Sequence, residues 1–196
     1  MTIQPVRLFG DPVLRARADE VTTFDRELRQ LVTDLTDTMR GSGGVGMAGP
    51  QIGVGLRVFV YDTNAAGNDR PGTRRAGHLV NPTYEVLGEE EQTGTEGCLS
   101  IPGLRYDVTR ALRVVARGVD IDGAPVEFEA EGLLARCVQH ETDHLDGVLY
   151  LDRLDAATRK VAMRAVRESE WFAAGKTVMS AAEVAGARTA SAGRGH

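Results

Sequence analysis

Apolar residues along the chain recur first with a helical period and later with a strand-like one. Between residues 24 and 39 they recur at steps of three and four, which predicts an amphipathic helix capped by Thr23 or Asp25. A second helix is expected to start near Gly132 and to stop at Gly147, where a glycine suits the end of a helix.

Strands are predicted where short apolar runs are bounded by turn residues. These runs are residues 57–62, 78–86, 112–120 and 125–132. Asp122 and Gly123 lie between the last two runs and predict a hairpin there. Two other segments contain too many turn-forming residues for regular structure. They predict a glycine-rich loop at 41–55 and a surface loop at 63–77.

These elements together predict the α+β fold class. A single domain over residues 1–172 is expected to place antiparallel strands around a central helix. One further helix lies near its N-terminus, and another, capped by Asp155, runs through Phe172 at its C-terminus. Residues 173–196 contain no aromatic side chain and are rich in Ala, Ser and Gly, which predicts a flexible tail.

Composition narrows the class of protein. The 196 residues are 42% hydrophobic and 26% charged, as in ordinary globular proteins. The net charge of −5 argues against nonspecific nucleic-acid binding through overall charge, with a local basic patch as the alternative, and no DNA partner is expected. No apolar run reaches the roughly 18 residues of a membrane span, and the N-terminus lacks the apolar core of a secretory signal. Two cysteines provide no disulfide framework, so we expect a cytoplasmic protein. Without an obvious coiled coil, a monomer is the default.

Residues 139–147, QHETDHLDG, contain two histidines four apart on the second predicted helix. Such residues share one helix face roughly 6 Å apart, so His140 and His144 can bind one metal ion. Glu141 is rotated about 100° from His140 and can instead take a proton from a metal-bound water. The alternative is a solvated helix face that binds nothing.

A catalytic site of this kind usually has three protein ligands, and the candidates for the third are Cys98, Cys137 or a carboxylate. His78 and His196 are interpreted as non-ligands. The side chain of Cys137 points toward the helix N-terminus, away from His144, so it is better explained as a small buried residue lining a pocket. Cys98 is therefore favoured. If both cysteines bound the metal, the site would be closed and structural.

Two further stretches of the sequence contain residues that can contribute to such a site. EGCLSIPG, residues 96–103, can present Cys98 at the edge of a cleft. GVGMAGPQIG, residues 44–53, permits close approach of its backbone to a ligand, and Gln51 offers an amide donor. The second stretch lacks the Gly-Lys-Ser/Thr ending of a phosphate loop.

Together, GVGMAGPQ, EGCLS and QHETDHLDG resemble the three motifs of peptide deformylase, which are G-x-G-x-A-A-x-Q, EGCLS and QHExDHLxG. The similarity extends over residues 3–172, and the longer loop and tail resemble the actinobacterial branch of this bacterial family. The resemblance implies a hydrolase that removes the N-formyl group from the initiator methionine of nascent polypeptides. A zincin-like peptidase shares HExxH but explains neither EGCLS nor Gln51, and a non-enzymatic metal module is the other alternative.

The resemblance also implies roles for individual residues. Cys98, His140 and His144 correspond to the metal ligands, and Glu141 to the general base and acid. Gln51 and the backbone N–H of Leu99 correspond to the oxyanion donors. The family is known for Fe(2+) and tolerates Zn(2+), Ni(2+) or Co(2+), among which ligand types do not discriminate.

The methionine pocket would then be lined by Val45, Leu99 and Cys137. Gly46 would bring its backbone against an extended substrate. Arg105 matches a family arginine near the cleft, although a solvated surface charge is the alternative.

Two residues depart from the family pattern. Gly49 replaces the second alanine of the first motif and is expected to loosen the loop that positions Gln51. Arg136 occupies a pocket-facing position that is often apolar, with a charge expected to reach solvent or the substrate backbone.

The last predicted helix carries Arg159, Lys160, Arg164 and Arg167. In relatives a C-terminal helix docks on the ribosome, and basic side chains suit RNA phosphates. The alternative is an ordinary amphipathic helix packed on the domain.

Overall fold

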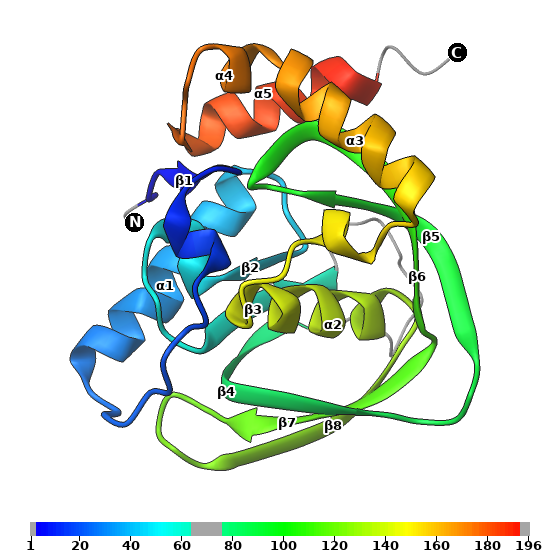
Figure 1. Cartoon of the computed structure of the whole chain (residues 1–196). Coiled ribbons are helices and arrows are strands. Elements are labelled where there is room, and N and C mark those ends of the chain that lie inside the picture. Colours follow the sequence, from blue (N-terminus) through cyan, green and yellow to red (C-terminus); the bar gives the residue numbers. More distant parts are fainter. Residues whose placement is uncertain (1–2, 64–75, 193–196) are drawn as a thin grey trace.

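The computed structural model describes residues 3–63 and 76–192, with an antiparallel sheet, a long hairpin and several helices (Figure 1). Its helices are α1 (Arg26–Gly41), α2 (Leu133–Leu145), α3 (Ala156–Glu168), α4 (Glu170–Ala173) and α5 (Ala181–Ala192). Its strands are β1 (Val6–Arg7), β2 (Gly46–Ala48), β3 (Val58–Asp62), β4 (Ala76–Val86), β5 (Glu91–Cys98), β6 (Ile101–Ala111), β7 (Arg113–Val119), β8 (Pro125–Glu131) and β9 (Val178–Met179). The expected α+β class is confirmed.

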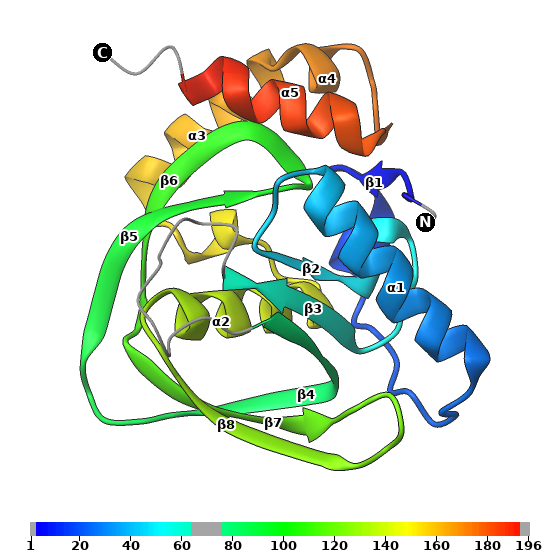
Figure 2. The ribbon, with the colours of Figure 1, turned by 180° about the vertical axis from the view of Figure 1, so that it is seen from behind.

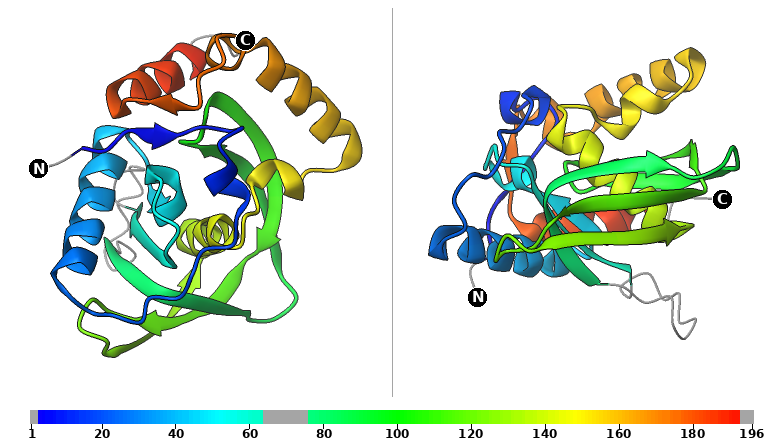
Figure 3. Two further views of the ribbon diagram at one scale, coloured as in Figure 1. Left: turned by 60° about the vertical axis from the view of Figure 1, so that its left-hand side comes forward. Right: turned by 90° about the horizontal axis from the view of Figure 1, so that it is seen from below.

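The strands form three antiparallel groups. The largest is a five-stranded sheet in the order β2-β3-β4-β7-β8, and the other two are the hairpin β5–β6 and the short pair β1–β9. Viewed along its axis, α2 lies in the middle of the molecule, with the sheet on one side and the hairpin beside it (Figure 3). All residues from Leu134 to Leu145 are buried, so this helix is the central element that the sequence predicted.

Local chemistry explains the elements that the sequence predicted correctly. The Asp25 side chain accepts hydrogen bonds from the N–H groups of Glu27 and Leu28, which starts α1. The turn between β7 and β8 is closed by Asp120, whose carboxylate accepts from the N–H groups of Asp122 and Ala124. Gly147 follows α2 with a φ of 73°, a conformation that favours glycine.

Some expectations were wrong. The glycine-rich segment forms β2 and a 3-10 helix over Gly49–Ile52, because β2 pairs with β3. Strands β5 and β6 were not predicted at all. The last predicted helix ends at Glu168 rather than Phe172, and α4 follows. The loop expected at 63–77 lies mostly outside the described residues.

The segment expected to be a flexible tail is part of the folded body up to Ala192. Strand β9 pairs with β1, with Val6 opposite Met179. Helix α5 lies beside α1 and across the curved end of β6 (Figure 2), with Val184 fully buried. This segment has few large apolar residues, so its order comes from tertiary packing and not from a visible pattern. In the described part of the chain, no helix is long and apolar enough to cross a membrane.

Candidate active site

Three potential metal ligands meet between α2 and the end of β5. The ligand atoms of Cys98, His140 and His144 all lie within 4.8 Å of one another. The helix presents the two imidazole rings from successive turns, with centroids 5.0 Å apart, and Cys98 Sγ lies 3.1 Å from His144 Nε2. The residues that the sequence grouped as a metal site are therefore neighbours in space.

The chemistry of this cluster fits a transition-metal ion. A thiolate and two imidazoles suit iron, zinc, nickel or cobalt better than magnesium or calcium. All three side chains are buried, and burial lowers the pKa of His144 well below its usual range, so that its ring is neutral as a ligand must be. Among the described residues, His144 Nδ1 and Glu141 Oε2 are buried polar atoms without a hydrogen-bond partner.

Glu96 orients His140, and sequence reasoning missed it. Glu96 Oε2 lies 2.9 Å from His140 Nδ1, which leaves Nε2 of that ring as the nitrogen available to a metal ion. Burial alone would raise the pKa of Glu96, but hydrogen bonds with His140 and Arg110 hold it well below its usual range. Glu96 lies two residues before Cys98, and residues two apart on a strand share a face. A correct strand prediction for EGCLS would have identified it.

Two buried arginines neutralise this glutamate. Arg110 donates to both carboxylate oxygens of Glu96 and also to Asp143 on α2. Arg136 Nη1 lies 2.7 Å from Glu96 Oε1 and also donates to Val108 O. The expectation that the Arg136 charge reaches solvent was therefore wrong, while the residue does line the pocket. Its guanidinium is buried because a carboxylate and backbone carbonyls are available inside the protein.

Glu141 and Cys137 lie on the pocket side of α2. Burial raises the pKa of Glu141 to about 7. Burial likewise raises the pKa of the Cys137 thiol well above its usual range, and its Sγ contacts Val45 O at 3.6 Å. Cys137 is thus a neutral thiol outside the three-ligand cluster, as its position on the helix predicted, and the closed site with two cysteines is not formed.

Gln51 is held beside the cluster by its own loop. Its Oε1 accepts from the N–H of Ala48 at 2.9 Å, and its Nε2 lies 3.6 Å from Cys98 Sγ and 3.3 Å from Ser100 Oγ. The side-chain amide therefore presents its donor end toward Cys98.

Gly49 does not loosen this loop, contrary to expectation. A Cβ at this position would lie 2.7 Å from Val54 O and 2.8 Å from Leu56 O. The glycine instead permits close backbone packing, which the hydrogen bond from Val54 N to Gly49 O completes.

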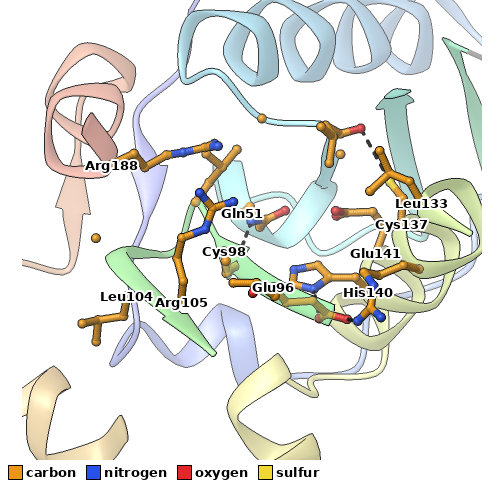
Figure 4. A pocket seen from close by; sticks show the side chains of 18 residues that line it. Gln51, Glu96, Cys98, Leu104, Arg105, Leu133, Cys137, His140, Glu141 and Arg188 are labelled. Atoms are coloured by element: carbon orange, nitrogen blue, oxygen red, sulfur yellow. Dashed lines mark hydrogen bonds and ion pairs between the residues drawn. The ribbon is translucent and has the colours of Figure 1, made fainter. Parts of the chain in front are cut away.

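A pocket opens onto the cluster and is lined by all six of the predicted substrate-binding residues (Figure 4). Its lining includes Val45, Gly46, Leu99, Arg105, Arg136 and Cys137, together with His140 and Glu141. The lining also includes residues that were not predicted, among them Glu96, Leu133 at the start of α2 and Arg188 of α5. No sequence signal pointed to Arg188, because its segment was interpreted as a tail.

Of the two other histidines, the structure describes only His78, and it agrees with the interpretation of that residue as a non-ligand. His78 Nε2 accepts a hydrogen bond from the N–H of Ile121, away from the cluster. His196 lies outside the described residues.

Comparison with known proteins identifies the family. The profile of the polypeptide deformylase family matches residues 3–160. The chain is 59% identical over 178 residues to a peptide deformylase of Acidothermus cellulolyticus, which covers 91% of this chain and 92% of that protein. It is 56% identical over 172 residues to peptide deformylase 1 of Corynebacterium glutamicum, covering 88% and 99% of the two chains.

Solved structures agree with these sequences. The crystal structure of a peptide deformylase from Legionella pneumophila superposes with a TM-score of 0.78 at 39% identity, and the match covers 89% of this chain and 99% of that one. A zincin-like peptidase and a non-enzymatic metal module are not supported. The chain belongs to the polypeptide deformylase family, and its function is the metal-dependent removal of the N-formyl group from nascent polypeptides.

Proposed function

We propose that Cys98, His140 and His144 hold the metal ion of this deformylase and that Glu141 is its general base and acid. The observation that carries the proposal is the three-ligand cluster within 4.8 Å at the inner end of an accessible pocket. A bound divalent metal supplies a water of lowered pKa and polarises the formyl carbonyl.

Glu141 has the environment that proton transfer in both directions requires. A pKa of about 7 lets the carboxylate accept a proton from water and return it to the departing amine near neutral pH. The products are then formate and a free N-terminus.

The oxyanion formed on the formyl carbon needs fixed donors. We assign this role to Gln51 Nε2 and the backbone N–H of Leu99. The hydrogen bond from Ala48 N to Gln51 Oε1 supports the assignment, since it fixes which end of the amide faces Cys98. Preorganised donors of this kind contribute roughly 3–4 kcal/mol each to transition-state stabilisation.

The methionine side chain would occupy the apolar wall formed by Val45, Leu99 and Cys137. Strand β2 is the edge strand of the sheet at this wall, so an extended peptide can pair with its backbone at Gly46. A Cβ at Gly46 would lie 2.8 Å from Cys137 Sγ and closer still to Glu141 Oε1. Arg105 lies at the pocket and is assigned to the downstream part of the substrate.

The assignment is tested by formate release from formyl-Met-Ala-Ser, using protein purified anaerobically with iron. We expect stoichiometric formate and no cleavage of internal peptide bonds. Formate absent from a metal-loaded protein would contradict it. We propose Fe(2+) as the native metal, with Zn(2+), Ni(2+) or Co(2+) as substitutes, and elemental analysis of anaerobically purified protein measures this directly.

We also propose that the protein works as a cytoplasmic monomer that docks on the ribosome through α3. Lys160, Arg164 and Arg167 fall on one exposed face of this helix, beside Val161, which is 61% exposed. The free, buried thiols of Cys98 and Cys137 suit a reducing compartment. Lys160→Glu with Arg167→Glu should weaken co-sedimentation with ribosomes, and light scattering should give the monomer mass.

A further inference from the structure

Helix α5 contributes a cation to the pocket from far along the chain. Arg188 lies in the pocket lining opposite Arg105 of β6, and the two guanidinium groups face the same part of the pocket (Figure 4). Arg188 Nη1 donates to the carbonyl oxygen of Ser42, just after α1, at 3.4 Å. The side chain is therefore held from α5 across to the segment that leads into β2.

Cys98 partly offsets the charge on Arg188, but this arginine pair has no carboxylate partner in the described part of the chain. Among the described residues, neither Arg105 nor Arg188 forms an ion pair with a carboxylate. Partial burial and the positive charge of Arg105 lower the pKa of Arg188, so the two cations repel each other in a partly desolvated place. The carboxylates that line the pocket, Glu96 and Glu141, belong to its metal end, and Glu96 is already neutralised by Arg110 and Arg136.

We propose that Arg188, together with Arg105, binds an acidic side chain of the substrate at the second or third residue after the formyl group. The inference rests on the proposed function, which places the formyl group at the metal ligands and the extended chain along β2. A chain advances about 3.3 Å per residue, so residues after the methionine lie outward from the metal end, where the arginine pair lies. A carboxylate there would relieve the repulsion and form charge-assisted hydrogen bonds.

The test compares amidated peptides that differ only in charge, formyl-Met-Ala-Glu against formyl-Met-Ala-Gln and formyl-Met-Glu-Ser against formyl-Met-Gln-Ser. For the wild-type protein we expect kcat/KM to favour glutamate about three- to tenfold at one or both positions. This preference should shrink as NaCl is raised from low to near-molar concentration, because salt screens the attraction.

Variants assign the preference to Arg188. Arg188→Gln should bring the Glu/Gln ratio of kcat/KM close to one, and Arg188→Glu should reverse the preference so that the ratio falls below one. The matched control is Arg26→Gln, which removes the same charge from an exposed residue at the other end of α1, about 20 Å or more from Ser42. The control should keep the wild-type ratio.

The outcomes separate the two proposals. Formate from both peptides with a wild-type ratio near one, or a ratio that Arg188→Gln leaves unchanged, would overturn the assignment of Arg188 and leave the deformylase site intact. Absence of formate even from the uncharged peptides would overturn the proposed site itself, and the present inference with it. Because the reversed preference of Arg188→Glu requires a folded and active protein, it also controls for misfolding.

Discussion

Glu96 Oε2 lies 2.9 Å from His140 Nδ1, and the same carboxylate accepts hydrogen bonds from Arg110 and Arg136. The proposed metal ligand His140, its acceptor and two cations thus form one buried network. A carboxylate behind a ligating histidine fixes the tautomer and orientation of the ring and increases its basicity.

Replacing Glu96 by Gln should weaken metal binding by roughly 10- to 100-fold, because the neutral amide orients His140 less strongly and is a weaker acceptor. Competition with a chelator at constant pH measures the affinity. Glu91→Gln, an exposed change on the same strand, is the control. Equal affinities for the two variants would exclude a supporting role for Glu96.

Glu141→Gln should reduce kcat for formyl-Met-Ala-Ser by about 10²–10⁴-fold while the metal content stays at one ion per chain. The side chain keeps its shape but can no longer accept the proton. Formate release and elemental analysis are measured on the same sample. An active variant, or one that has lost its metal, would contradict the role assigned to this glutamate.

The two cysteines should respond differently to substitution by serine. Cys98→Ser removes a thiolate from the three-ligand cluster and should lower the bound metal substantially. Cys137→Ser should retain it, because Cys137 is a neutral thiol outside that cluster. Metal loss from Cys137→Ser would indicate a closed, structural site instead.

Gly49→Ala should destabilise the protein by about 1–3 kcal/mol, because the new methyl group would press against the carbonyl oxygens of Val54 and Leu56. Gly55→Ala is a matched control, since a Cβ there meets no atom within 4 Å. Urea unfolding of both variants gives the two free energies of unfolding. Similar values would mean that the loop around Gln51 tolerates the methyl group.

Asp152 should make the protein more stable at neutral than at acid pH. Its carboxylate is paired with Arg15 and Arg159 and accepts a hydrogen bond from the N–H of Leu149. Burial alone would raise the pKa of Asp152, but these interactions hold it below the usual range. A carboxyl group with a lowered folded-state pKa contributes stability above its unfolded pKa, about 3.9, and loses it as the pH falls through the folded value.

Asp152→Asn should therefore cost about 1 kcal/mol at pH 7 and progressively less below about pH 4. Denaturant unfolding of wild type and variant at several pH values measures the difference. A difference that stays constant down to pH 2.5 would show that the charge of Asp152 does not contribute.

The histidine pair of the Cys-His-His cluster was the most predictable part of the molecule, because helical spacing alone places His140 and His144 on one face. Strand β5 escaped prediction since its sequence, EQTGTEGC, has no apolar alternation, and its order comes from pairing with β6. Glu96 was missed as a consequence. Arg136 was misjudged because a single sequence does not reveal which carboxylate a buried cation will meet.

The position of Arg188 in the pocket could not be predicted from the sequence, for a different reason. Helix α5 is largely Ala with few strongly apolar residues, so it shows no amphipathic pattern, and only its packing against β6 and α1 holds it in place. Alanine favours a helix intrinsically, but the position of α5 against the pocket comes from tertiary contacts, which no local pattern encodes.

The pairing of Val6 with Met179 also determines when the enzyme can be completed during its own synthesis. Strand β1 is synthesised before its partner β9, which follows only after α2 and the clustered residues Cys98, His140 and His144. Until then, α5 cannot pack against β6 and α1 and add Arg188 to the lining of the pocket. The β1–β9 pair and the part of the pocket lining that α5 supplies therefore form only after the rest of this fold has been synthesised.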